Sequence, residues 1–165
     1  MKKLIILLVL LVSKNFYSQI LDPISWKTSV EKITTTEYNL ITTATIDSGW
    51  HLYSQNVPKD GPIPTTFSFE KSNDFKLLGT PTEEEGKTVN DQVFNMKIKY
   101  FEKNTIFKQR IKVSNPNTFN VTGELEFMVC NDENCLPPTF VDLKFVIPAQ
   151  NDLKKKTVKL KRNKD

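Results

Sequence analysis

Apolar and polar side chains alternate along most of the chain, so that every second residue falls on the same face of an extended backbone. In the segment 107–113, Phe107, Ile111 and Val113 face one way and the basic residues between them face the other. A period of two is typical of half-buried antiparallel strands. The pattern predicts strands over residues 40–46, 66–71, 75–78, 95–101, 107–113, 120–130 and 141–147.

Turn-forming residues separate these segments, at 60–62 (Asp-Gly-Pro), 85–86 (Glu-Gly) and 115–117 (Asn-Pro-Asn). About seven or eight short strands without a helical pattern favour an all-β fold, an immunoglobulin-like antiparallel β-sandwich. The cysteine pair that joins the two sheets of antibody domains is not expected here. The only two cysteines, Cys130 and Cys135, lie too close in sequence to occupy strands of different sheets.

The first 18 residues have the pattern of a secretory signal peptide. Lys2 and Lys3 precede an unbroken apolar run over residues 4–12, which is too short to anchor the chain in a bilayer. We expect cleavage after Ser18, an exported domain over residues 19–149 and no stable membrane insertion after cleavage. Export places the cysteines where disulfides persist.

The formal net charge of +4 is unevenly distributed. The leader contributes +3 and the basic tail, residues 154–165, contributes +6, so the body between them carries −5. A mildly acidic body argues against a nucleic-acid partner. The predicted tail region, residues 150–165, is interpreted as a solvated end, with contact to an anionic membrane surface as the alternative.

The cysteines stand at the two ends of a polar turn. Cys130 closes an alternating apolar run and Cys135 opens a Leu-Pro-Pro segment, so that the two sulfurs can meet across residues 131–134. A ring of about six residues stabilises a fold by only about 2 kcal/mol. This spacing favours an exchangeable disulfide over a structural staple, although the staple remains an alternative.

Residues 49–55 gather Trp50, Tyr53 and the chain's only histidine, His51. The conservative interpretation is a pair of core aromatics, and the sharper one is an aromatic wall beside the cysteines. Nothing in the sequence ties His51 to either sulfur as a catalytic base. Two cysteines and one histidine leave a tetrahedral zinc one ligand short, so we expect no metal and no cofactor.

Three stretches, residues 50–55, 61–65 and 130–138, together resemble the amino-terminal periplasmic domain of the thiol:disulfide interchange protein DsbD, in a stand-alone form. The similarity extends over residues 26–148. The paired cysteines followed by Leu-Pro-Pro are its most specific element.

The resemblance implies an immunoglobulin-like domain that relays electrons in the periplasm, in pathways that include cytochrome c biogenesis. Its partners would be thioredoxin-fold proteins and a DsbD-like membrane reductase. Cys130 and Cys135 would form the redox pair, with Cys135 forming the mixed disulfide. Residues 90–94 resemble the family's cap loop, in which Val93 and Phe94 would shield the sulfurs.

Two features depart from the family pattern. Four residues separate the cysteines where many members have five, and Val93 aligns with the aromatic cap residue, leaving Phe94 as its nearest replacement. No residues after 148 match the membrane helices or the thioredoxin-like domain. We therefore expect a separately encoded relay domain or a descendant that lost the circuit.

The two hypotheses about function predict different properties of the cysteines. In a relay, a partner thiolate attacks the disulfide, and the acidic Asp132 and Glu133 make the pair a slow nucleophile that depends on its partner. The alternative is a non-catalytic, secreted, immunoglobulin-like binding module. In that case both cysteines are buried and resist mild reductant.

Overall fold

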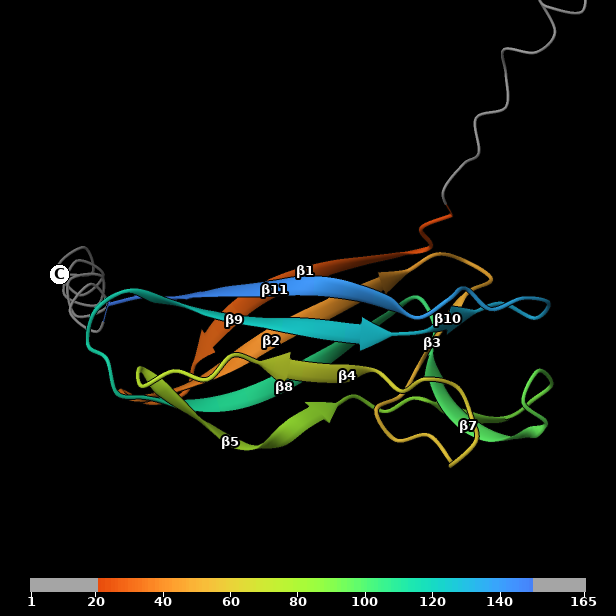
Figure 1. Ribbon diagram of the computed structural model, residues 1–165, viewed down its shortest axis with the longest axis horizontal. Coiled ribbons are helices and arrows are strands. Elements are labelled where there is room, and N and C mark those ends of the chain that lie inside the picture. Colours follow the sequence, from red (N-terminus) through yellow and green to blue (C-terminus); the bar gives the residue numbers. More distant parts are fainter. Residues whose placement is uncertain (1–20, 150–165) are drawn as a thin grey trace, which may run out of the picture.

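The computed structural model describes residues 21–149, and the predicted leader and tail lie outside the described residues. The described chain is all-β, as predicted, and is drawn in Figure 1. Its strands are β1 (Ile24–Lys32), β2 (Glu37–Ile46), β3 (His51–Tyr53), β4 (Thr66–Phe69), β5 (Phe75–Glu83), β6 (Lys87–Asp91), β7 (Met96–Phe101), β8 (Asn104–Val113), β9 (Phe119–Phe127), β10 (Val129–Cys130) and β11 (Thr139–Ile147).

Two antiparallel sheets form the body of the molecule. One has the strand order β1-β2-β8-β5 and the other β11-β9-β4. Strand β8 shows how the alternating sequence builds the core: Phe107, Ile111 and Val113 are buried while Lys108 and Lys112 are exposed. The inward rows of both sheets join one main apolar core, which confirms the predicted immunoglobulin-like sandwich.

A third sheet, small because its strands have only two to six residues, lies at one end of the sandwich, at the right of Figure 1. Its strand order is β10-β3-β7-β6. The predicted single strand over residues 120–130 is wrong, because the chain changes partners at Met128. Phe127 pairs with Thr139 in β11, whereas Val129 pairs with Leu52 in β3. The change of sheet carries Cys130 out of the sandwich and into the small sheet.

The sequence pattern missed three strands, β1, β3 and β6. In β1 a polar residue, Thr28, interrupts the apolar row, and its hydroxyl donates a hydrogen bond to the Lys144 carbonyl of β11 at 2.8 Å. In β3 all three residues are buried, so no alternation is visible. The three predicted turns all lie between strands.

Candidate functional site

The Asn131 side chain shapes the turn that joins the cysteines. Its Oδ1 accepts hydrogen bonds from the backbone N–H of Glu133 at 2.9 Å and of Asn134 at 2.7 Å. The backbone N–H of Asn131 donates to the Asn134 carbonyl at 2.9 Å. This compact Asx-type turn brings the Cα atoms of Cys130 and Cys135 to 4.0 Å, and a disulfide joins the two residues.

The two sulfur-bearing residues differ in exposure. Cys130 has no exposed surface, whereas Cys135 is half-buried. Alternation along β10 explains this arrangement, because Val129 enters the main core and Cys130 enters a second apolar cluster on the opposite face, with Tyr53 and Ile98. A partner that approaches from solvent therefore meets Cys135 first.

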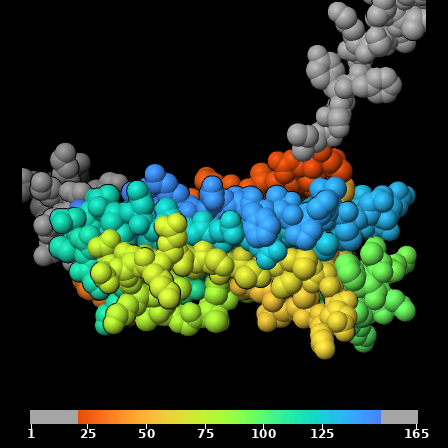
Figure 2. Space-filling model, in the orientation of Figure 1, coloured from red at the N-terminus to blue at the C-terminus, as the bar shows by residue number. Residues whose placement is uncertain are grey.

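The hairpin of β6 and β7 stands beside the cysteine turn, and Figure 2 shows its green tip next to the blue segment at the right-hand end. Its connecting turn, residues 92–95, is called the cap turn below. The Asp91 Oδ1 accepts the backbone N–H of Val93 at 2.9 Å and of Phe94 at 3.1 Å. Asn95 completes the turn in the left-handed region, with φ of 52°.

The two predicted cap residues have different environments. Phe94 is half-buried and packs against the cluster that contains Cys130, and its ring lies edge-on to that of Tyr53 at 5.9 Å between centroids. Val93 is 49% exposed. The structure thus brings Phe94, and not Val93, into the cysteine cluster.

Behind the cap turn, three side chains form a chain of hydrogen bonds. The Tyr53 hydroxyl donates to Asp91 Oδ2 at 2.9 Å, and His51 Nε2 lies 3.2 Å from the Tyr53 hydroxyl oxygen. Because the single phenolic proton points to Asp91, the His51 Nε2–H must be the donor to Tyr53. Burial, and then the bond to Asp91, raise the pKa of Tyr53, so this residue stays a neutral donor.

The predicted aromatic wall is only partly present in the structure. His51 stacks on Tyr100 with 4.5 Å between ring centroids and meets Tyr53 edge-on at 5.2 Å, whereas Trp50 packs against the main core instead. Asp91 and Tyr100 were not among the site residues predicted from the sequence. An aspartate at the start of a turn is a capping signal that could have identified Asp91.

A cleft of about 260 Å³ separates the cap turn from the cysteine turn. His51 and Tyr100 line it together with Asp91 on the cap side and Asp132 on the cysteine side. None of its lining residues is a lysine or an arginine. The mouth of the site is therefore polar and acidic.

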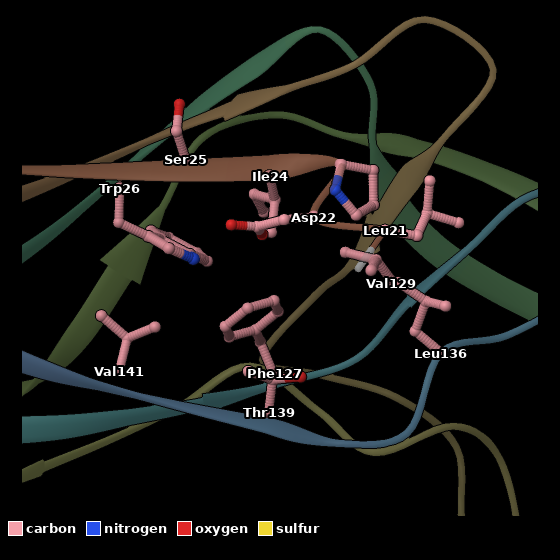
Figure 3. Close-up of a pocket in the computed structure, with 11 residues that line it drawn as sticks. Leu21, Asp22, Ile24, Ser25, Trp26, Phe127, Val129, Leu136, Thr139 and Val141 are labelled. Carbon is pink, nitrogen blue, oxygen red and sulfur yellow. The ribbon is translucent and has the colours of Figure 1, made fainter. Parts of the chain in front are cut away.

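A larger apolar groove of about 530 Å³ opens between the ends of β1 and β11, and Figure 3 shows its lining side chains. Val129 and Leu136, which directly flank the two cysteines in sequence, line it with Trp26 and Phe127. The Leu136 N–H also donates to the Val129 carbonyl at 3.0 Å. The arms of the cysteine turn are thus anchored by apolar packing.

Within residues 21–149, no group of three or more His, Cys, Asp or Glu side chains is placed to hold a metal ion. In the same part of the chain, no helix is long and apolar enough to cross a membrane.

A β-sandwich that carries a disulfide in an end turn, with one buried and one half-buried cysteine, fits the class of thiol:disulfide interchange domains. The family described as "Thiol:disulfide interchange protein DsbD, N-terminal" matches residues 20–146. The chain belongs to this family, and the resemblance found in the sequence is confirmed.

A solved structure shows the same fold. The amino-terminal domain of Neisseria meningitidis DsbD in its reduced form is 15% identical, with a TM-score of 0.50, and the match covers 79% of this chain and 90% of that chain. The amino-terminal periplasmic domain of ScsB from Proteus mirabilis is 16% identical, with a TM-score of 0.47, and the match covers 81% of this chain and 50% of that one. No curated protein is significantly similar to the chain.

Proposed function

We propose that the protein is a periplasmic domain that relays electrons through Cys130 and Cys135, from a thioredoxin-fold donor to extracytoplasmic thiol proteins. A DsbD-like membrane reductase would recharge the donor. The observation that carries this proposal is the asymmetric disulfide, in which Cys135 is half-buried and Cys130 has no exposed surface. The leader pattern and the family support the periplasmic location.

The reaction is two consecutive thiol–disulfide exchanges. A thiolate of the reduced donor attacks the Cys135 sulfur, the Cys130–Cys135 bond breaks, and Cys130 leaves as a thiolate that takes up a proton. The donor's second thiolate then attacks its own sulfur in the mixed disulfide, so that Cys135 is released and is also protonated. Two electrons and two protons have moved to the domain, and the donor has become a disulfide.

Passing the electrons on reverses the roles. The Cys135 thiolate attacks a disulfide of the acceptor protein, and Cys130 resolves the mixed disulfide by attacking Cys135. Two exposed carboxylates, Asp132 and Glu133, lie in the turn between the cysteines. Their negative charge disfavours a thiolate at Cys135, so the domain reacts fast only with a partner that docks.

In the proposed mechanism Phe94 is the main shield of the disulfide. Its ring covers the cluster around Cys130, while Val93 extends the cap outward. His51 and Tyr53 form the wall behind the cap, whereas Trp50 packs against the main core. A docking protein can displace a turn that a small thiol cannot.

The decisive experiment is trapping with purified proteins. In the Cys130→Ala variant, Cys135 is first converted to a mixed disulfide with 5-thio-2-nitrobenzoate. A reduced thioredoxin-fold protein that lacks its second cysteine should displace this group and stay covalently bound to Cys135, whereas the matched Cys135→Ala variant, treated in the same way, should bind far less. The oxidised parent should also be reduced by the same donor with both of its cysteines.

A disulfide that resists both the donor and millimolar dithiothreitol in the folded protein would support the alternative instead. That alternative is a non-catalytic secreted binding module whose bridge is only structural.

A further inference from the structure

His51 lies between two turns that each carry a carboxylate. Asp91 begins the cap turn and Asp132 belongs to the cysteine turn, and all three residues line the same cleft. His51 Nε2 is 3.9 Å from Asp91 Oδ2, and Asp132 is close enough to raise the pKa of the imidazole. A positive charge on His51 would therefore attract both sides of the cleft.

The neutral imidazole already makes its one hydrogen bond, to Tyr53. Protonation leaves that bond intact, because Nε2–H remains a donor, and adds a charge only 8% exposed to solvent. Since solvent screens such a charge poorly, its main effect falls on the carboxylates that face it.

We propose that His51 is a positioning residue for the cap turn: protonation of its imidazole draws Asp91 and Asp132 toward each other and closes the cap over the disulfide. This inference rests on the proposed function, because a cap matters only if the cysteines exchange. Protonation of His51 would make the disulfide exchange more slowly with small thiols in acid, and the neutral imidazole would leave the site more open at neutral pH.

The other titratable groups around His51 do not reverse the direction of this pH effect. Burial raises the pKa of Tyr53 and of Tyr100, so both stay neutral across the histidine range. Glu102 adds attraction, although Lys87 pairs with it at 2.5 Å. Burial lowers the pKa of His51 and the three carboxylates raise it, with burial prevailing. The cap therefore closes at a pH below the pKa of an ordinary histidine.

The test follows the reduction of the oxidised, full protein by a neutral phosphine, tris(hydroxypropyl)phosphine, between about pH 8 and about pH 5. Each rate is divided by that of hydroxyethyl disulfide at the same pH, which removes the protonation of the phosphine itself. In the parent we expect the ratio to fall about fivefold toward acid. In His51→Gln, which keeps a hydrogen-bond donor but cannot be charged, the ratio should stay flat.

The exposed Asp132→Asn variant serves as a second probe, because a surface change in the turn leaves the core untouched. In this variant the ratio of rates should fall less toward acid pH than it does in the parent. A flat ratio in the parent, or an undiminished step in His51→Gln, would overturn the inference. The double variant Val93→Ala/Phe94→Ala distinguishes failure of the cap from failure of the role of His51. If this variant is reduced no faster than the parent, the cap does not shield the disulfide. If it is reduced faster, but the fall in the ratio toward acid persists in His51→Gln, only the role of His51 is rejected.

Discussion

The Phe94 ring stands edge-on to the Tyr53 ring, at 88° and 5.9 Å between centroids, and both rings pack in the cluster that encloses Cys130. An aromatic pair in this geometry is worth about 1 kcal/mol beyond its buried area. The cap turn is therefore held to the site by a contact that one side-chain truncation removes.

We expect Val93→Ala/Phe94→Ala to raise the alkylation rate of reduced Cys135 several-fold, because truncation removes the shield and leaves the sulfur. Phe94→Ala alone should give most of the increase, since Val93 is 49% exposed. The rate is measured with a small thiol reagent in the folded state, with circular dichroism as the check on the fold. The matched control is Phe140→Ala/Val146→Ala, which truncates the same two residue types at exposed positions of β11. Equal rates in all forms would remove the cap from the mechanism.

Tyr53→Phe should loosen the cap by a different route. The change leaves Asp91 Oδ2 without the donor that it has at 2.9 Å and leaves the His51 Nε2–H without its acceptor. Loss of buried hydrogen bonds of this kind costs about 1–2 kcal/mol of unfolding free energy. Urea unfolding measures that loss, and alkylation of reduced Cys135 should become faster in the same variant. An unchanged unfolding midpoint would show that the network does not hold the cap.

The double variant Cys130→Ala/Cys135→Ala should remain folded. Closing so short a ring contributes only about 2 kcal/mol, so the melting temperature should fall by about 4–8 °C with a single cooperative transition. Differential scanning calorimetry on the oxidised parent and the variant makes the comparison. Loss of cooperative unfolding would instead mark the bridge as a structural staple.

Glu83 should make stability depend on acid pH. Its carboxylate accepts hydrogen bonds from Ser54 Oγ at 2.5 Å, the Gln55 N–H at 2.8 Å and Lys99 Nζ at 3.0 Å. Burial acts to raise the pKa of Glu83, but these bonds prevail and lower it. A lowered pKa in the folded state means that the stabilisation is complete above the unfolded value of about 4.3 and is lost as pH falls through the folded value.

Glu83→Gln should therefore destabilise the protein by about 2 kcal/mol at neutral pH, and the difference from the parent should shrink below about pH 4. Urea unfolding at a series of pH values gives the curve. Glu85→Gln, at an exposed position two residues further on, in the connection between β5 and β6, is the control and should change little. A difference that does not vary with pH would contradict the role of the charge.

The strands that the sequence revealed are those with one buried face. In β8 the alternation of Phe107 with Lys108 arises because one face of the strand lies in the core and the other faces water. Strand β3 shows no such alternation, because His51, Leu52 and Tyr53 are all buried. Periodicity cannot identify a three-residue strand of that kind.

The spacing of the cysteines predicted the turn, but the surroundings of the disulfide depend on contacts between distant residues. Asp91 reaches Tyr53 across 38 positions of sequence, and nothing local indicates that pairing. The direction in which Val93 and Phe94 point depends on the geometry of a four-residue turn. The resemblance to a family predicted a cap at residues 90–94, but only the structure distinguishes the positions of its two side chains, Val93 and Phe94.

The three residues of β3 divide the apolar interior into two parts. Leu52 belongs to the main core and its neighbour Tyr53 to the cysteine cluster. In the hairpin of β6 and β7, Phe101 joins the main core, but Ile98 and the side chains around it pack in the cysteine cluster. The hairpin should therefore exchange its amide protons with deuterium sooner than β2 and β8 do. A partner would then meet a region that unfolds locally on a scaffold that does not, and repeated oxidation and reduction would leave the sandwich intact.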